Sequence, residues 1–409
     1  GGLVMNYSNL REDFPTLRQE NAPAYLDNAC VTLKPDSVIK SISDYYSMYP
    51  GCGGRSVHRY GTQVSRLVSN SRKSIADFIN AKSVNEVVFS RNTTHSINQI
   101  AKGISWKEGD VVITGDREHN SNLVPWLQLV EEQGIEHVIV KSNQDNTFNL
   151  ENFEQLCDEH GERLKMVSLS HVGNLDGIDI PIAKIAEITH RYDALIAVDG
   201  AQSTPHMNVD VQALDIDFLS FSIHKMCGPS GMGGLWGRYE LLDSLRSIQS
   251  GGQTVQTAHY DSVKWAAPPS RFEGGLGNFA GMIASGKAIE YLSKLNMDDV
   301  HEHEIKLNQI ITQRIKHLDA IEIIGPEDAS KRGGICSILM GELPSHDIAL
   351  LLDEAAGVMV RSGQHCVHSW FNDRGIENGS LRASAYFYNT EEEAKLFADT
   401  FCEAVEAFS

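Results

Sequence analysis

The segment Phe218-Leu219-Ser220-Phe221-Ser222-Ile223-His224-Lys225-Met226-Cys227-Gly228-Pro229 is the one around which the rest of the chain is organised. Its apolar start is typical of a short buried strand, and a glycine turn follows. Lys225 comes just past the strand end, between polar neighbours. A lysine at such a place is usually only solvated. Its amine is also suited to the covalent capture of an aldehyde cofactor.

A second strand end favours the cofactor interpretation. The apolar run 194–198 is followed directly by Asp199. Pyridoxal 5'-phosphate requires a carboxylate that keeps its pyridine nitrogen protonated and a lysine that binds its aldehyde. Asp199 and Lys225, at the ends of two successive strands, therefore predict an enzyme that uses this cofactor.

The pattern of strands and helices predicts the fold class. Between about residues 65 and 240, short apolar runs alternate with helical patterns, which is typical of an α/β fold with a mostly parallel sheet covered by helices. The glycine-rich run 231–237 does not match the dinucleotide fingerprint, because Trp236 stands where its last glycine is needed. We expect an N-terminal arm (1–24), a large cofactor-binding domain (25–295) whose first segment packs on the small domain, and a small α+β C-terminal domain (296–409).

Composition excludes several classes of protein. The formal net charge of −19 argues against binding to nucleic acid or to anionic membrane surfaces. No apolar stretch approaches the ~18–20 residues of a membrane-spanning helix, and no signal peptide is evident. Seven widely spaced cysteines without a Cys-x-x-Cys pair are typical of free thiols in a reducing compartment. We therefore expect a cytoplasmic protein.

Several motifs in a fixed order resemble one family. Asp199-Gly200-Ala201-Gln202, Ser222-x-His224-Lys225, Arg271-Phe272-Glu273-Gly274-Gly275 and Arg361-Ser362-Gly363-Gln364-His365-Cys366 are similar to those of the Suf-type (group II) cysteine desulfurases. These are fold-type I pyridoxal phosphate enzymes of the class V aminotransferase superfamily. The resemblance runs from about Tyr25 to the C-terminus. It implies a seven-stranded-type sheet, L-cysteine as substrate, a homodimer, and a sulfur-acceptor or iron–sulfur scaffold protein of the Suf system as partner.

The resemblance also assigns residues to the cofactor. Free N–H groups and hydroxyls at the predicted helix start 90–94 suit a phosphate, although the same residues are ordinary helix caps. Thr94 is the expected phosphate contact, and His119 is expected to stack on the pyridine ring and move protons. Asn174 should lie near the ring oxygen and the substrate carboxylate. The implied cofactor-binding set is Thr94, His119, Asn174, Asp199, Gln202, Ser222, His224 and Lys225.

Cys366 distinguishes a desulfurase from other enzymes of this superfamily. The family resemblance implies that its thiolate takes the sulfur of L-cysteine as a persulfide, with Lys225 and His119 as the other catalytic residues. Arg382 should bind the substrate carboxylate, because the planar guanidinium pairs with a carboxylate through two bonds. We expect Arg361, Arg55 and His58 on the substrate side of the site. For Arg55 and His58, an ordinary structural role in a loop is equally open. No metal site is expected from 365–368, because grouped ligands are lacking.

The chain departs from the family pattern at several places. Gln364 replaces the first histidine of His-His-Cys, Gly274 and Leu276 alter the loop that follows Arg271, and Cys30 stands where alanine is usual. We interpret Cys30 as a structural residue, since free cysteines commonly pack as small apolar groups. Selenocysteine lyase and cysteine-sulfinate desulfinase activities remain open because of Gln364. Another class V aminotransferase or lyase, or a non-catalytic sulfur-delivery protein on the same fold, are the remaining alternatives.

Overall fold

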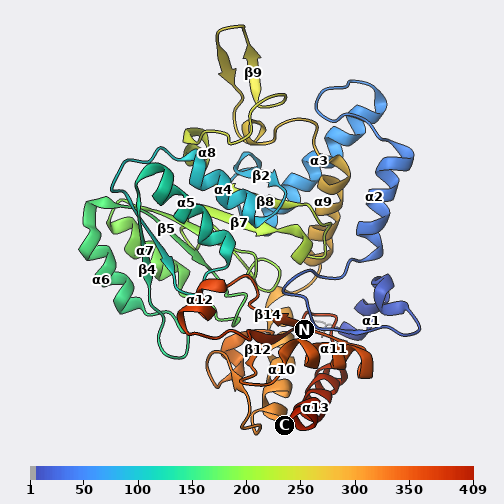
Figure 1. Ribbon diagram of the computed structural model, residues 1–409. Coiled ribbons are helices and arrows are strands. Elements are labelled where there is room, and N and C mark those ends of the chain that lie inside the picture. Colours follow the sequence, from blue (N-terminus) through green and yellow to red (C-terminus); the bar gives the residue numbers. More distant parts are fainter. Residues whose placement is uncertain (1–5) are drawn as a thin grey trace.

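The computed structural model describes residues 6–409, so the first five residues of the predicted N-terminal arm lie outside it. A seven-stranded sheet forms the centre of the larger body, in the order β2-β8-β7-β6-β5-β3-β4 (Figure 1). Five neighbouring strands, from β7 to β4, are parallel, and β8 is antiparallel to both of its neighbours. The predicted α/β fold class is confirmed. The strands are β2 (Val87–Ser90), β3 (Val111–Gly115), β4 (Glu136–Val140), β5 (Leu164–Ser170), β6 (Leu195–Asp199), β7 (Phe218–Ser222) and β8 (Gly233–Gly237).

Helices bury both faces of this sheet, as expected for strands that read as continuous apolar runs. Ile97, Ile100 and Trp126 pack on one face from α4 and α5, and Ile185 and Ile289 pack on the other from α7 and α9. The first face is covered by α4 (Thr93–Gly103), α5 (Val124–Gln133) and α8 (Tyr239–Ser244), and the second by α3 (Arg59–Phe78), α6 (Leu150–His160), α7 (Ile182–Arg191) and α9 (Phe279–Ser293), with α2 (Asp36–Met48) packed on α9.

A second, antiparallel sheet lies below the first in Figure 1, in the order β11-β12-β15-β14. The predicted capping box of the last helix is confirmed, because Thr390 and Glu393 cap each other's backbone N–H groups. The elements of this part are α10 (Met297–Ile315), β11 (Glu322–Ile323), β12 (Ile335–Leu339), α11 (Ser345–Ala356), β13 (Val358–Met359), β14 (Arg361–Gly363), α12 (His368–Asp373), β15 (Ser380–Ser384) and α13 (Glu391–Phe408). The domain boundaries given above stay a prediction.

The N-terminal segment joins this second part directly. After α1 (Tyr7–Leu10) and two short 3-10 turns, β1 (Ala24–Tyr25) pairs in parallel with β13. Asp27 continues this contact through a bridge to Ser384 at the end of β15. The segment that enters the large body therefore passes first along the edge of the small sheet.

The structure of two parts of the chain was not predicted from the sequence. Gly233–Gly237 of the glycine-rich run form β8, and Phe221 of β7 packs so closely on it that a Cβ at Gly234 would lie 2.2 Å from the Phe221 ring. Between Gly252 and Gly274, a hairpin of β9 (Val255–Ala258) and β10 (Val263–Trp265) stands away from the body (Figure 1). Among residues 6–409, no helix has the length and apolarity that a membrane crossing requires.

Candidate active site

A cleft of about 550 Å³ opens at the carboxyl ends of β5, β6 and β7, where open α/β sheets bind their ligands. The start of α4 and the loop after β3 complete its wall. All eight predicted cofactor residues line this cleft together, and sequence reasoning missed Thr93, Ser121 and Ser170. The lining residues are Asn92, Thr93, Thr94, His119, Ser121, Ser170, Val172, Asn174, Asp199, Ala201, Gln202, Ser222, His224 and Lys225.

Lys225 and Asp199 lie at the base of the cleft. Lys225 ends the 3-10 turn Ile223–Lys225 that follows β7, and Asp199 is the last residue of the neighbouring strand β6. Burial lowers the pKa of Lys225, while the charge of Asp199 opposes that shift. Burial raises the pKa of Asp199. The Ala201 N–H, which donates to the carboxylate at 3.0 Å, and the charge of Lys225 both act to lower that pKa. The lysine therefore has an increased neutral fraction, as a nucleophilic amine requires.

Hydroxyls and backbone donors gather at the start of α4. Ser222 accepts the Thr93 N–H at 3.0 Å and is hydrogen-bonded to the Thr93 hydroxyl at 2.6 Å. The Thr94 hydroxyl is hydrogen-bonded to Ser121 at 2.6 Å. Burial, with the Lys225 and Lys34 charges, lowers the pKa of His224 to about 4. A helix N-terminus with four hydroxyls around it is a suitable place for a phosphate.

His119 lies between this end of the cleft and the small sheet. Its Nδ1 accepts the Ser121 N–H at 3.0 Å, which fixes the ring against the short 3-10 turn Asn120–Asn122. Burial, reinforced by the Lys225 and Arg382 charges, lowers its pKa to about 3. A neutral imidazole in this position can stack on an aromatic ring without adding charge to the cleft.

Asn174 lines the cleft, and Arg382, on β15 of the small sheet, contacts the backbone of Asn174. Arg382 is 1% exposed, and its Nη1 donates to the Asn174 carbonyl at 3.0 Å. Its Nε and Nη2 have no hydrogen-bond partner, and the Asp27 carboxylate lies 3.6 Å from Nη2. Burial lowers the pKa of Arg382 to about 10. A buried guanidinium with two free donors is suited to binding a carboxylate.

Cys366 follows β14 on a turn in which His365 and Cys366 both have positive φ, 53° and 58°. The His365 carbonyl accepts the Asn174 side-chain amide at 2.7 Å, and the Cys366 carbonyl accepts the Asn120 N–H at 2.6 Å. These two bonds hold the thiol next to residues of the cleft. Arg361 Nη2 lies 3.9 Å from the Cys366 Sγ, so a cation accompanies the thiol. His368, at the start of α12, lies 2.8 Å from the Asn120 amide.

Two predicted substrate residues lie elsewhere in this chain. Arg55 donates to Gln253 at 3.1 Å and lines a different cavity of about 660 Å³, together with Leu276. His58 caps α3 by accepting the Gly61 N–H. Neither residue lines the cleft that contains Lys225. The local sequence could not show this, because Arg55 contacts Gln253, which lies 198 residues further along the chain.

The cleft fits pyridoxal 5'-phosphate. Asp199 is buried in the cleft beside the Lys225 charge, and a pyridinium bound there would give this carboxylate a second cationic neighbour. The Gln202 Oε1 is buried without a partner, while its Nε2 donates to the Ala29 carbonyl at 2.8 Å. Within residues 6–409, no three His, Cys, Asp or Glu side chains are grouped so as to bind a metal. The donors present therefore suit an aromatic cation with a phosphate.

Comparisons with known proteins agree with this geometry. The aminotransferase class-V family matches residues 24–397. A probable cysteine desulfurase of Halalkalibacterium halodurans is 36% identical over 99% of both chains, and a cysteine desulfurase of Haloferax volcanii is 34% identical over 98% of this chain and 97% of its own.

Solved structures give the same result. The cysteine desulfurase of Thermococcus onnurineus matches all of both chains with a TM-score of 0.93 and 32% identity, and CsdA of Escherichia coli does so with 0.91 and 28%. The class V aminotransferases depend on pyridoxal 5'-phosphate. This chain belongs to the aminotransferase class-V family, as a full-length homologue of cysteine desulfurases.

Proposed function

We propose that this protein is a cysteine desulfurase that converts L-cysteine to L-alanine and leaves a persulfide on Cys366. The observation that supports it most is the double attachment of the Cys366 turn. His365 and Cys366 are hydrogen-bonded through their carbonyls to Asn174 and Asn120, on either side of the thiol. An aminotransferase or another lyase has no use for a thiol held there.

Each side chain has a definite task in the proposed reaction. Arg382, through its free Nε and Nη2, would bind the substrate carboxylate, with Asn174 beside it. When bound, the cofactor would supply a sink for the negative charge that develops at Cα. Lys225, held in a setting that lowers its pKa, would take the Cα proton as general base.

The sulfur step belongs to Cys366. Its thiolate would attack the substrate sulfur, so that the Cys366 Sγ–S bond forms and the Cβ–S bond breaks. The electron pair of the broken bond stays on Cβ, which takes up a proton, and alanine results. Arg361 beside the Sγ would stabilise the attacking thiolate. This step requires no oxidant.

The cofactor set is proposed from the same cleft. Thr94, Ser222 and His224 would surround the phosphate at the start of α4, and His119 would stack on the ring. Asp199 would pair with the pyridine nitrogen, with Gln202 close to the ring oxygen. Support comes from their common lining of one cleft and from the low pKa of His119 and His224.

The decisive experiment measures alanine and sulfide from L-cysteine in the presence of a reductant, with L-aspartate and cysteine sulfinate as comparison substrates. Equal amounts of alanine and sulfide, lost in Cys366→Ala, are the expected result. Alanine formed from cysteine sulfinate alone would instead indicate a desulfinase. The half-buried Gln364 next to the buried His365 is the feature that keeps selenocysteine as an alternative substrate.

We further propose a homodimer that transfers sulfur to an acceptor or iron–sulfur scaffold protein of the Suf system in the cytoplasm. The dimer is supported by the second cavity, where Arg55 and the exposed Leu276 lie outside this chain's own cleft. Seven free thiols support a reducing compartment. Sedimentation at assay concentration tests the dimer, and a fully active monomer would refute it.

A further inference from the structure

Glu118 is a buried carboxyl group that is surrounded by neutral donors. It is 4% exposed and precedes the short 3-10 turn Asn120–Asn122. Both of its oxygens accept the Ser170 N–H at 3.1 Å, and the Asn122 side-chain amide donates to Oε2 at 3.2 Å. Among the described residues 6–409, no lysine, arginine or histidine forms an ion pair with it. A buried carboxyl group in such a setting is costly to ionise.

The position of this carboxyl group is fixed by its neighbours. The Asn122 Oδ1 accepts the Trp126 indole N–H at 3.0 Å and the Ser168 hydroxyl at 2.6 Å, so its amino group is the part that faces Glu118. Gly115, the last residue of β3, leaves room for the carboxyl group, because a Cβ there would lie 3.0 Å from Glu118 Oε1. Glu118 is therefore held in place without a positive charge beside it.

The Ser170 hydroxyl can bond to either of two carboxyl groups. Its Oγ lies 2.6 Å from Glu118 Oε2. Ser170 ends β5 and is directly opposite Asp199 in the parallel β5–β6 pair, and both side chains line the cleft. A hydrogen bond from this hydroxyl lowers the pKa of Asp199. A hydroxyl has a single proton, so it can donate to Glu118 or to Asp199 but not to both.

We propose that Glu118 is a positioning residue that carries a proton and donates it in a hydrogen bond to Ser170, so that the Ser170 hydroxyl donates to Asp199. The Asp199 carboxylate then accepts this bond in addition to the Ala201 N–H at 3.0 Å. The inference rests on the proposed pairing of Asp199 with the pyridine nitrogen. It adds that the negative charge of Asp199 is maintained by Glu118, which does not itself line the cleft.

The charges around the two carboxyl groups favour a proton on Glu118. Burial raises the pKa of both groups, and the charge of Asp199 raises that of Glu118 further. Asp199 faces the Lys225 charge, which acts to lower its pKa, whereas Glu118 has no cationic neighbour. Two buried carboxyl groups this close cannot both ionise at low cost. The one beside the lysine is therefore the one that keeps its charge.

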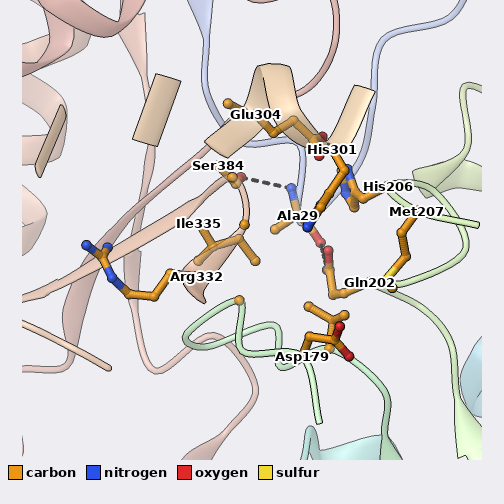
Figure 2. Close-up of a pocket in the computed structure, with 15 residues that line it drawn as sticks. Ala29, Asp179, Gln202, His206, Met207, His301, Glu304, Arg332, Ile335 and Ser384 are labelled. Carbon is orange, nitrogen blue, oxygen red and sulfur yellow. Dashed lines mark hydrogen bonds and ion pairs between the residues drawn. The ribbon is translucent and has the colours of Figure 1, made fainter. Parts of the chain in front are cut away.

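The first test detects the proton in the holoenzyme by infrared spectroscopy at neutral pH, in water and in heavy water. We expect a carbonyl stretch of a protonated carboxylic acid that Glu118→Gln removes. Glu304→Gln is the matched control, because Glu304 is 1% exposed but is hydrogen-bonded to His206 at a neighbouring cavity; Figure 2 shows these two side chains together. That variant should keep the band. Identical spectra of the parent and Glu118→Gln in this region would overturn the proposal.

The second test follows the ring nitrogen of the cofactor by nitrogen NMR, with pyridoxal 5'-phosphate isotopically labelled at that atom. In Ser170→Ala, the pH at which this nitrogen loses its proton should fall by about one unit, because Asp199 loses a charge-assisted hydrogen bond. Ser170→Thr keeps the hydroxyl and should restore the parent value. Glu118→Gln should also stay within about 0.3 unit, since its amide can donate to Ser170 as the acid does.

The outcomes separate this inference from the proposed function. A rise of about one unit in Glu118→Gln would mean that the parent Glu118 is ionised and takes the Ser170 proton, which would overturn its role. An unchanged value in Ser170→Ala would overturn the transmission through Ser170. A parent ring nitrogen that is unprotonated at neutral pH would instead refute the pairing with Asp199 on which the proposed function relies.

Discussion

Replacing Arg382 with lysine isolates the role of the guanidinium. Arg382 Nη1 donates to the Asn174 carbonyl, which leaves Nε and Nη2 for the substrate carboxylate. Lysine keeps the charge opposite Asp27 but offers a single ammonium in place of the two-donor fork. Losing one charge-assisted hydrogen bond costs about 1.5–3 kcal/mol. We therefore expect kcat/KM for L-cysteine to fall about 10- to 100-fold, since every ~1.4 kcal/mol is tenfold.

The assay is the initial rate of alanine formation over a range of L-cysteine concentrations, with the bound cofactor measured by absorbance in the same samples. Arg332→Lys is a matched control. Arg332 is also fully buried, but it donates to the Pro326 carbonyl and to Thr312, away from Lys225. That variant should lower the melting temperature without a comparable loss of kcat/KM. A kcat/KM of Arg382→Lys within about twofold of the parent, ~0.4 kcal/mol, would refute the carboxylate role.

Three further predictions concern the lysines and the thiol. Lys225→Ala should abolish the yellow absorbance of the purified protein, and borohydride fixing the cofactor on another lysine would contradict the assignment. Cys366→Ala should keep that absorbance and release no alanine from L-cysteine, yet still act on selenocysteine; desulfuration at the parent rate would remove Cys366 from the mechanism. Burial lowers the pKa of Lys34 from 10.5 in the unfolded chain to about 8 in the folded protein. Between pH 8 and pH 10.5 the unfolded chain therefore binds more protons than the folded protein. Stability relative to Lys34→Met should therefore rise from pH 8 to pH 10.5 in melting curves, and a flat or falling difference would contradict the burial of this amine.

The positions of Asp199, Lys225 and His224 could be predicted because the sequence shows where strands end. A short apolar run shows where a strand stops, and parallel strands bring their carboxyl ends to one edge of the sheet. The structure joins these residues in one cleft. The same rule would have found Ser170 at the end of β5, which the sequence reasoning passed over.

Other features depend on contacts that are distant in the sequence. Glycine is uncommon in strands, but Gly234 is needed in β8 because the Phe221 ring of the neighbouring strand fills the space that its side chain would occupy. The interpretation of Cys30 as structural followed from the usual packing of free cysteines. The preceding Ala29 is bonded to Ser384 and Gln202, 355 and 173 residues away, and these contacts cannot be inferred from residues 25–34 alone.

The segment 27–34 connects the two sheets at the site. At one end, Asp27 lies 3.6 Å from Arg382 and Ala29 is bonded to Ser384, so the segment moves with β15. At the other end, Lys34 donates to the His224 carbonyl at 2.7 Å, so the segment also moves with the turn that carries Lys225. A displacement of the small sheet that separated Arg382 from Lys225 would have to break one of these attachments. The distance between the proposed carboxylate-binding group and the proposed base is therefore set by this short segment, because it is bonded to both sheets.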